Sequence, residues 1–160
     1  LVVISLSNTR LNQKSETIAW EMAAMVSDPD YQARPMPKNP YELVFDFIRT
    51  HSPEDALQLA KFIEDWTGSS LKDKALLNRI GFNQVSEALD KDWGIALLKL
   101  NTMLFPEDGN LWDSLGEGYF LINDTDHARE SFEKALELGA GNACHWCENS
   151  RDKLDQLNGQ

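Results

Sequence analysis

The chain has 160 residues, of which 42% are hydrophobic, and its formal net charge is −11. That length and apolar content fit one globular domain, or one domain with a short additional piece. The longest unbroken apolar run, Met22–Val26, is too short to cross a membrane, and the negative charge opposes binding to nucleic acid or to anionic lipid.

The N-terminal part predicts a strand followed by a helix. Leu1–Leu6 is rich in β-branched side chains, which favour strands, and turn-forming residues follow it. From Ser15, apolar residues recur every three or four positions, which predicts a helix that ends near Ser27. Prolines and polar residues over 28–40 indicate a linker. We therefore expect a short N-terminal piece, residues 1–27, and a helical domain, residues 41–158.

Beyond the linker the sequence predicts helices joined by short loops. Tyr41–Arg49 carries its apolar residues on one face. Ser52 precedes a second helix that extends to about Trp66, with a proline at its first position and carboxylates in its first turn. Small residues after Gly68 then separate it from a third helix, Leu71 to about Glu87.

Near the C-terminus, seven large and small residues stand at positions 4, 7, 8, 11, 20, 24 and 27 of one window. Small residues at crossing points let two antiparallel helices lie close together, and the large ones fill the gaps between them. The window, about 34 residues long, resembles a tetratricopeptide (TPR) repeat. The resemblance implies a helical array that binds other polypeptides and performs no catalysis. The seven residues are Trp112, Leu115, Gly116, Tyr119, Ala128, Phe132 and Ala135.

The preceding residues match the same pattern more loosely. Alignment of Gly81 with Gly116, with a one-residue insertion near Asp90, brings further residues onto pattern positions, and a last helix from about Asn142 to Leu157 is suited to cap the array. The expected fold is all-α: a TPR-like stack of antiparallel helical hairpins with a C-terminal capping helix, preceded by one orphan strand and a helix. The additional matching residues are Ile80, Gly94, Leu98, Asn101 and Pro106.

The TPR resemblance also implies a peptide groove, lined by the first helix of each repeat. Asp113 and Glu117 have the wrong sign for binding a C-terminal carboxylate, so the groove suits a basic side chain next to an apolar one. Alternatively, these acids form only a solvated surface and the apolar residues only pack between repeats. The expected partner is a protein or peptide, with a basic peptide suited to the groove, and not a nucleic acid. The candidate groove residues are Asn78, Phe82, Asn110, Asp113, Glu117, Phe120 and Leu121.

The two cysteines, Cys144 and Cys147, stand three positions apart. Metal binding needs four ligands within reach, and the histidines at positions 51 and 127 have no neighbouring thiol. A redox pair is usually found where a strand runs into a helix, and no strand precedes these residues in the predicted order. A structural or incidental role, a redox role and a metal role remain open, and no cofactor is expected.

The tryptophans are expected mainly in the core. Trp20, Trp66 and Trp93 lie on apolar faces of the predicted helices. Trp146, next to the cysteine pair, is instead a candidate for a small exposed patch and for self-association. A homodimer through this last helix or through the orphan strand is therefore one expectation.

The opening Leu-Val-Val-Ile-Ser-Leu-Ser-Asn-Thr, followed by a helix, looks like the last strand and C-terminal helix of β-lactamase-like and penicillin-binding-type serine hydrolases. The order of strand, helix, proline-rich linker and repeats resembles bacterial members of that family that carry a TPR tail. The resemblance implies that this chain is the C-terminal part of such a hydrolase, with a periplasmic or otherwise extracytoplasmic location.

The catalytic motifs of that family are only partly matched. Ser-x-x-Lys occurs at Ser69, Ser131 and Ser150, but the companion Tyr-x-Asn or Ser-x-Asn element and the Lys-Thr-Gly strand do not occur. We therefore expect no catalytic residues in this chain. It is either an interaction domain, or an intramolecular tail that stabilises or regulates the hydrolase without an external partner.

Overall fold

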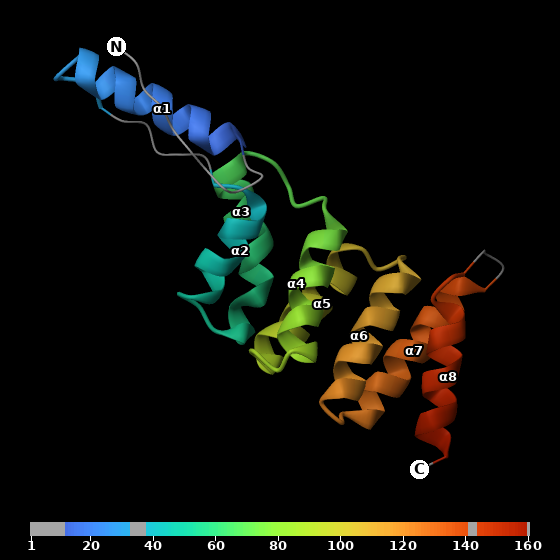
Figure 1. Ribbon diagram of the computed structural model, residues 1–160. Helices are drawn as coiled ribbons and strands as arrows, with labels where there is room; N and C mark the ends of the chain where they lie inside the picture. Colours follow the sequence, from blue (N-terminus) through green and yellow to red (C-terminus); the bar gives the residue numbers. More distant parts are fainter. Residues whose placement is uncertain (1–11, 33–37, 141–143, 160) are drawn as a thin grey trace. The chain divides into compact units, whose positions relative to one another are not determined.

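The computed structural model describes residues 12–32, 38–140 and 144–159, and every regular element among them is helical (Figure 1). The all-α prediction is therefore confirmed for these residues, while the predicted strand Leu1–Leu6 lies outside them. None of the described helices has the length and apolar character needed to cross a bilayer. The elements are α1 Asn12–Ser27, α2 Pro40–Ile48, the 3-10 helix η1 Pro53–Gln58, α3 Leu59–Thr67, α4 Lys74–Ser86, α5 Lys91–Leu104, α6 Gly109–Leu121, α7 Thr125–Gly139 and α8 Cys147–Asn158.

The chain divides into two compact units, residues 1–38 and residues 39–160. In the first unit, α1 is followed by a turn in which the Tyr31 hydroxyl donates to the Glu21 carboxylate at 3.0 Å. Trp20 is 77% exposed, so its predicted place in the core is wrong. The apolar Ile18 and Met22 on the other face of α1 are also exposed, at 38% and 49%, so the apolar pattern of this helix does not correspond to a buried face.

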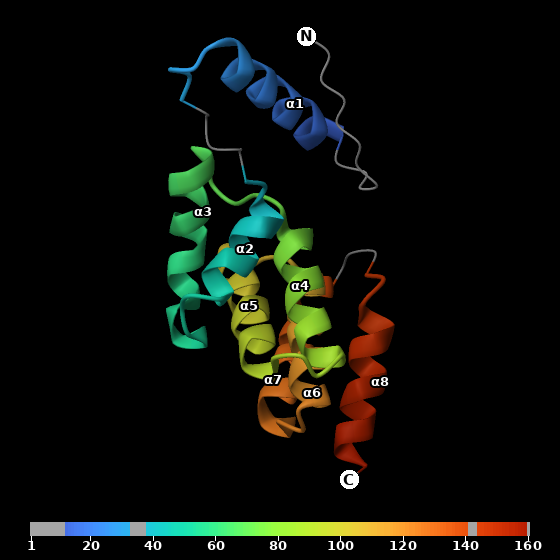
Figure 2. The same cartoon turned by 60° about the vertical axis from the view of Figure 1, so that its left-hand side comes forward.

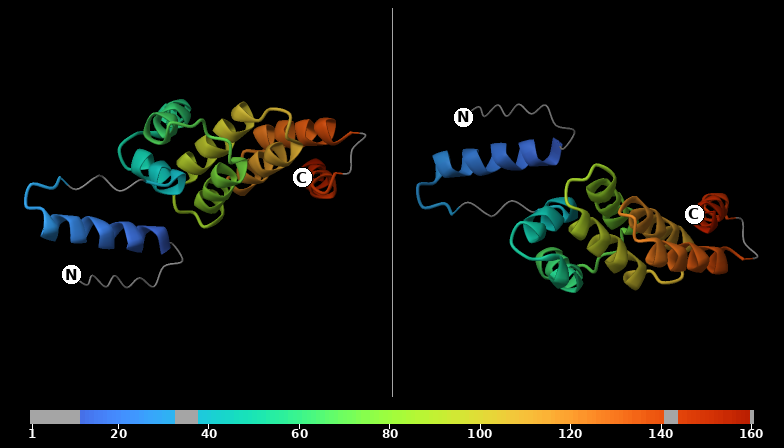
Figure 3. Two further views of the ribbon diagram at one scale, coloured as in Figure 1. Left: turned by 90° about the horizontal axis from the view of Figure 1, so that it is seen from above. Right: turned by 90° about the horizontal axis from the view of Figure 1, so that it is seen from below.

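The second unit is a succession of paired helices. The views in Figures 1 and 2 show α4 beside α5 and α6 beside α7, with the two members of each pair running in opposite directions. Seen from above and below, the pairs follow one another along the unit (Figure 3). At the C-terminal end of the unit, α8 lies against α7 and α6. Each pair therefore covers a face of its neighbour.

The second unit begins with a short helix, α2, and a helix that starts irregularly. Asn39 caps α2 by accepting from the Glu42 backbone nitrogen at 2.9 Å, as a good N-cap residue does. Ser52 donates from its backbone nitrogen and its hydroxyl to the Asp55 carboxylate, at 3.2 and 3.1 Å. The predicted helix after Ser52 opens as η1 before it becomes α3, because first turns often adopt the tighter 3-10 geometry. Gly68 ends α3 at φ +68°, a left-handed conformation that favours glycine.

Aspartates begin all four helices from α4 to α7. The side chains of Asp73, Asp90, Asp108 and Asp124 each accept from a backbone N–H of the first turn. Such caps satisfy donors that the helix itself leaves unpaired, and the carboxylates also suit the positive end of the helix dipole. Asp73 also explains why α4 begins at Lys74 rather than at the predicted Leu71.

Glycines permit the closest helix contacts. A Cβ on Gly94 would lie 2.8 Å from the Gly81 carbonyl oxygen and 2.4 Å from a Val85 methyl carbon. A Cβ on Gly116 would lie 2.7 Å from two ring carbons of Phe132. The small residues of the sequence pattern therefore stand where α5 meets α4 and where α7 meets α6.

Two apolar clusters fill the second unit. The first joins α2, η1 and α3 to α4 and α5, and it contains the predicted core residue Trp93 at 3% exposure. The second lies among α4, α5, α6, α7 and α8. Trp66 is 54% exposed at the end of α3, so its predicted burial is wrong; it stands beside Phe62, at the edge of the first cluster. Of the seven pattern residues, all but Trp112 are buried.

The last helix starts later than predicted. Residues 144–146 are not helical, and α8 begins at Cys147 rather than near Asn142. A disulfide between Cys144 and Cys147 closes the turn that leads into the helix. Residues 141–143 lie outside the described part of the chain.

Replacement of Gly94 by Ala tests the glycine contacts. The new Cβ meets a backbone oxygen and a stiff β-branched side chain, neither of which moves aside at low cost. We expect Gly94→Ala to lower the free energy of unfolding by about 1 to 3 kcal/mol in urea denaturation, despite the better helix propensity of Ala.

Gly159→Ala is the matched control for this change, since the nearest atoms to its Cβ would be 3.5 and 4.0 Å away. It should leave stability within about 0.5 kcal/mol of the wild-type value. Equal stability of the Gly94→Ala and wild-type proteins would mean that α4 and α5 do not depend on this close approach.

Candidate interaction surface on α6, α7 and α8

The candidate groove residues lie on α4 and α6. Asn78 and Phe82 are half-buried on α4, and Asn110 is half-buried in the first turn of α6. Further along α6, Asp113, Glu117 and Phe120 are spaced three or four residues apart and share one face of the helix. Leu121, at the end of α6, is 43% exposed. The structure brings the three residues of that shared face together under α8.

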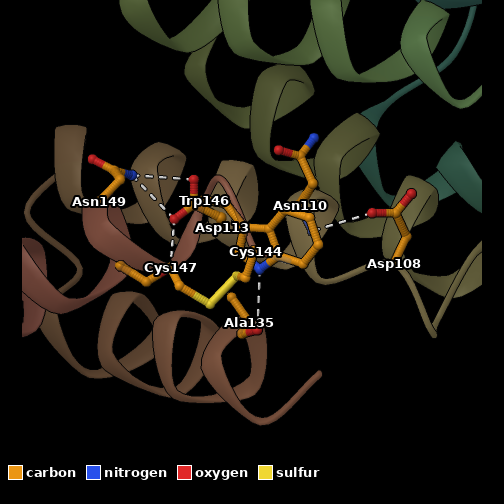
Figure 4. The surroundings of a disulfide bond; sticks show 9 residues. Asp108, Asn110, Asp113, Ala135, Cys144, Trp146, Cys147 and Asn149 are labelled. Carbon is orange, nitrogen blue, oxygen red and sulfur yellow. Dashed lines mark hydrogen bonds between the residues drawn. A yellow bond between two sulfur atoms is a disulfide. The ribbon is translucent and has the colours of Figure 1, made fainter. Parts of the chain in front are cut away.

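Asp113 lies at the centre of this contact and is only 8% exposed. Its carboxylate accepts from the Asn149 side-chain nitrogen at 3.0 and 3.1 Å and from the Ser150 hydroxyl at 2.5 Å. Ser150 is completely buried, so α8 itself removes this carboxylate from water. Figure 4 shows Asn149 directed at Asp113 from α8.

Burial raises the pKa of the Asp113 carboxyl above its ordinary value, because desolvation disfavours the charged form. The hydrogen bonds from Ser150 and Asn149 act in the opposite direction, since they stabilise the carboxylate. The nearby Glu117 charge raises the pKa further, and His145 lowers it. The desolvation of Asp113 therefore outweighs the partners that α8 provides.

Lys153 of α8 makes the second polar contact with this face. Its Nζ lies 3.8 Å from a Glu117 carboxylate oxygen and 4.3 Å from the centroid of the Phe120 ring. Both the Lys153 and Glu117 side chains are largely screened from solvent, at 22% and 21% exposure. A partly desolvated ammonium over an aromatic ring gains about 0.5 to 2 kcal/mol. One basic residue therefore engages both the acidic and the aromatic groups of the face.

The disulfide and Trp146 fix the start of α8. The Trp146 Nε1 donates to the Ala135 carbonyl oxygen of α7 at 3.2 Å (Figure 4). A Cβ on Gly109, at the start of α6, would lie 2.9 Å from the Trp146 ring. A Cβ on Gly139, at the end of α7, would lie 2.5 and 2.4 Å from the sulfurs of Cys144 and Cys147. Gly109 thus leaves space for the indole ring at the start of α6, and Gly139 leaves space for the disulfide at the end of α7.

A cleft of about 690 Å³ opens next to this turn. It has a size typical of ligand pockets, an apolar wall and a few charged residues. The ammonium group of Lys74 is paired with the Asp108 carboxylate at its rim, which links the first turns of α4 and α6. The cleft is lined by Lys74, Phe105, Pro106, Glu107, Asp108, Gly109, Asn110, Leu138, His145 and Trp146.

The remaining candidate residues are not gathered by α8. Asn78 has a buried side-chain oxygen without a hydrogen-bond partner in the structure. Asn110 lines the cleft, as does Trp146 (Figure 4). The cysteines form a disulfide, and within residues 12–32, 38–140 and 144–159 no three His, Cys, Asp or Glu side chains are placed to hold a metal ion.

The α8 residues that complete this surface were not selected from the sequence. A signal was present, because Trp146 and Ser150 follow Trp112 and Gly116 at the repeat interval of about 34 residues. The first helix of a further repeat would carry its large and small residues there. The buried contacts between Asp113 and α8 depend on this register.

Comparison of the chain with known protein families, with curated proteins and with solved structures gives no match.

The pH dependence of stability tests the burial of Asp113. Its folded-state pKa lies above the unfolded-state value, so the folded state binds the proton more tightly. The contribution of Asp113 to stability therefore falls as the pH rises from about 3.8. Asp113→Asn lacks this group, and we expect the wild-type protein to lose stability relative to the variant as the pH rises above about 3.8.

Urea denaturation of both proteins at several pH values measures this difference directly. The comparison removes the effects of other titrating groups, which both proteins share. A difference in unfolding free energy that stays constant over the whole range would contradict the burial of a charged Asp113.

Proposed function

We propose that this chain is a non-catalytic helical repeat domain that mediates protein–protein or interdomain interaction. The observation that carries the proposal is the contact between α6 and α8. The face formed by Asp113, Glu117 and Phe120 already holds a polypeptide helix through hydrogen bonds, an ion pair and a cation–π contact. A surface that binds a helix of its own chain has the chemistry to bind one from a partner.

The regularity of α4 to α7 supports a TPR-like array. The helix-capping aspartates recur at about 34 residues, from Asp73 to Asp108 and from Asp90 to Asp124. The turns inside the two hairpins also correspond, because Ala88 and Asn123 both have positive φ, at 52° and 63°. The same local structure thus occurs twice, as expected of a protein that builds a binding surface by repetition.

The chemistry of the face favours a helix with a basic residue next to apolar ones. Lys153 illustrates the match, since its ammonium group lies near the Glu117 carboxylate and also over the ring of Phe120. The net charge of −11 acts in the same direction, because it attracts cations over a longer range. The partner in this proposal is therefore a protein or peptide with at least one Lys or Arg.

The alternative function is that of an intramolecular tail that stabilises or regulates its own protein. The contact between α6 and α8 also favours this alternative, because Asp113 is only 8% exposed beneath α8. In this case the array needs no external partner and α8 is its permanent cap.

We also propose that the chain is the C-terminal part of a β-lactamase-like serine hydrolase. Exposed apolar side chains on α1 support a larger domain around that helix: Ile18, Met22, Met25 and Val26 are 38%, 49%, 45% and 69% exposed. Such residues normally pack against another surface. Two of the Ser-x-x-Lys serines have structural hydrogen bonds, Ser131 to the His127 carbonyl oxygen and Ser150 to Asp113. These bonds support a non-catalytic role for this chain.

The coding sequence upstream of Leu1 tests the hydrolase assignment. We expect it to encode Ser-x-x-Lys, Tyr-x-Asn and Lys-Thr-Gly motifs in that order, because these supply the nucleophile and its partners in this class of hydrolase. An upstream sequence without these motifs would contradict the assignment and leave the interaction proposal unchanged.

Peptide binding tests the interaction proposal. We expect a fluorescent helical peptide with lysines on one face and leucines on the other to bind the full chain in an anisotropy titration. Glu117→Gln removes one charge from the contact and should weaken binding by about threefold to fivefold, the usual contribution of a partly exposed ion pair.

Glu133→Gln is the matched control, because Glu133 is exposed on α7 and the variant has the same net charge as Glu117→Gln. It should leave the affinity unchanged. Equal weakening in the two variants would indicate general charge attraction rather than binding at this face. A chain that binds none of the peptide, whether its disulfide is intact or reduced, would support the tail alternative.

A further inference from the structure

We infer that the disulfide between Cys144 and Cys147 controls the docking of α8, so that a dithiol reductant releases the helix and uncovers Asp113, Glu117 and Phe120. The functional meaning of this release, access of a partner to the face, rests on the proposed function. The release itself is a property of the structure and can be measured without a partner.

The disulfide lies where α8 meets α7. Cys147 is the first residue of α8 and is 4% exposed, whereas Cys144 is partly exposed. Both sulfurs fill the space above Gly139, at the last residue of α7, where a Cβ would come within 2.5 Å of them. The covalent bond thus keeps the two sulfurs together as one group that packs on the end of α7.

Trp146 depends on the same turn. Between the two cysteines, it donates to Ala135 of α7 and lies on Gly109 of α6. A four-residue ring closed by the disulfide restricts the backbone at Trp146 and so favours the one conformation in which the indole reaches both helices. The disulfide and the indole form a single anchor at the start of α8.

The remainder of α8 is weakly apolar. Its buried residues beyond Cys147 are Ser150 and Leu157, with Leu154 partly buried. A helix of 12 residues is marginal in water when it is not packed on a protein. Its hydrogen bonds with Asp113 also have to compensate for the desolvation of that carboxylate. Docking of α8 therefore relies strongly on the anchor at its start.

The chemical step is thiol–disulfide exchange. A thiolate of the dithiol attacks the sulfur of Cys144, the more exposed of the two cysteines, the bond to Cys147 breaks, and the second thiolate of the reductant then displaces Cys144. Two electrons and two protons pass to the protein, which gains two thiols, and the reductant becomes a cyclic disulfide. The loss of a four-residue ring reduces the stability of the closed turn by about twentyfold on loop-closure entropy.

Hydrogen exchange of the full chain, followed by mass spectrometry, tests this inference. Complete reduction by dithiothreitol, verified by thiol alkylation, should raise the exchange rate of amides in residues 148–157 by about tenfold to twentyfold. Amides of α4 and α5 should keep their rates. Unchanged protection of α8 after complete reduction would overturn the inference.

The double variant Cys144→Ser with Cys147→Ser separates the disulfide from other effects of the reductant. It should show the fast exchange of α8 without dithiothreitol and no further change with it. A double variant with the slow exchange of the oxidised wild-type protein would also overturn the inference. The single variant Trp146→Phe, which keeps the disulfide but loses the bond to Ala135, should lie between the two states.

The anisotropy titration with the lysine–leucine peptide distinguishes this inference from the proposed function. If both hold, reduced protein binds the peptide more tightly than oxidised protein, and Glu117→Gln weakens binding in either state. Release of α8 without any peptide binding would support the inference and contradict the proposed function. Peptide binding that depends on Glu117 but not on reduction, with α8 still protected from exchange, would support the proposed function and contradict the inference.

Discussion

The close approach of helix backbones at glycine is the constraint on which the second unit depends. Gly94 meets the Gly81 carbonyl group at the crossing of α4 and α5, and Gly116 receives the Phe132 ring at the crossing of α6 and α7. Interiors at crystal-like packing density do not accommodate an extra methyl group at such points without a shift of backbone. The distance between the helices of each pair then determines which side chains face the next pair. The surface under α8 is a consequence of that spacing, because it presents Asp113, Glu117 and Phe120 on one side of α6.

The second unit is predictable where large, small and capping residues recur. The helices around Gly116 and Phe132 follow from that pattern, and the small residues from Gly68 onward correctly indicate that α3 ends there. Helix ends were less accurate, because several residues compete for the cap: Asp73 begins α4 although Ser70 also precedes it. The exposure of Trp20 and Trp66 could not be predicted from the sequence, since an apolar pattern on a helix does not indicate whether another element packs against that helix. Trp66 stands at the end of its helix, where the cluster ends.

For a related reason, only the α6 residues of the candidate surface could be predicted from the sequence. Its α6 residues follow from the register of one helix, which a sequence pattern contains. Its α8 residues come from a segment about one repeat further along, and their contacts depend on how the chain turns at Cys144 and Cys147. The sequence left the state of these cysteines open between structural, redox and metal roles. The structure connects the pair with α7, through the packing of both sulfurs on Gly139, and with α8, which begins at Cys147 and binds Asp113.

The capping aspartates change the meaning of the chain's acidity. Asp73, Asp90, Asp108 and Asp124 are bound to backbone N–H groups at the starts of four successive helices, so their charges complete the helix ends. Asp113 is likewise an internal hydrogen-bond acceptor. Five of the acidic residues that contribute to a net charge of −11 thus already have hydrogen-bond partners within the fold before any partner protein is considered. A more neutral version of this protein could be made by changing its outer carboxylates, whereas the four cap positions would each need another side chain that accepts from the backbone, such as Asn or Ser.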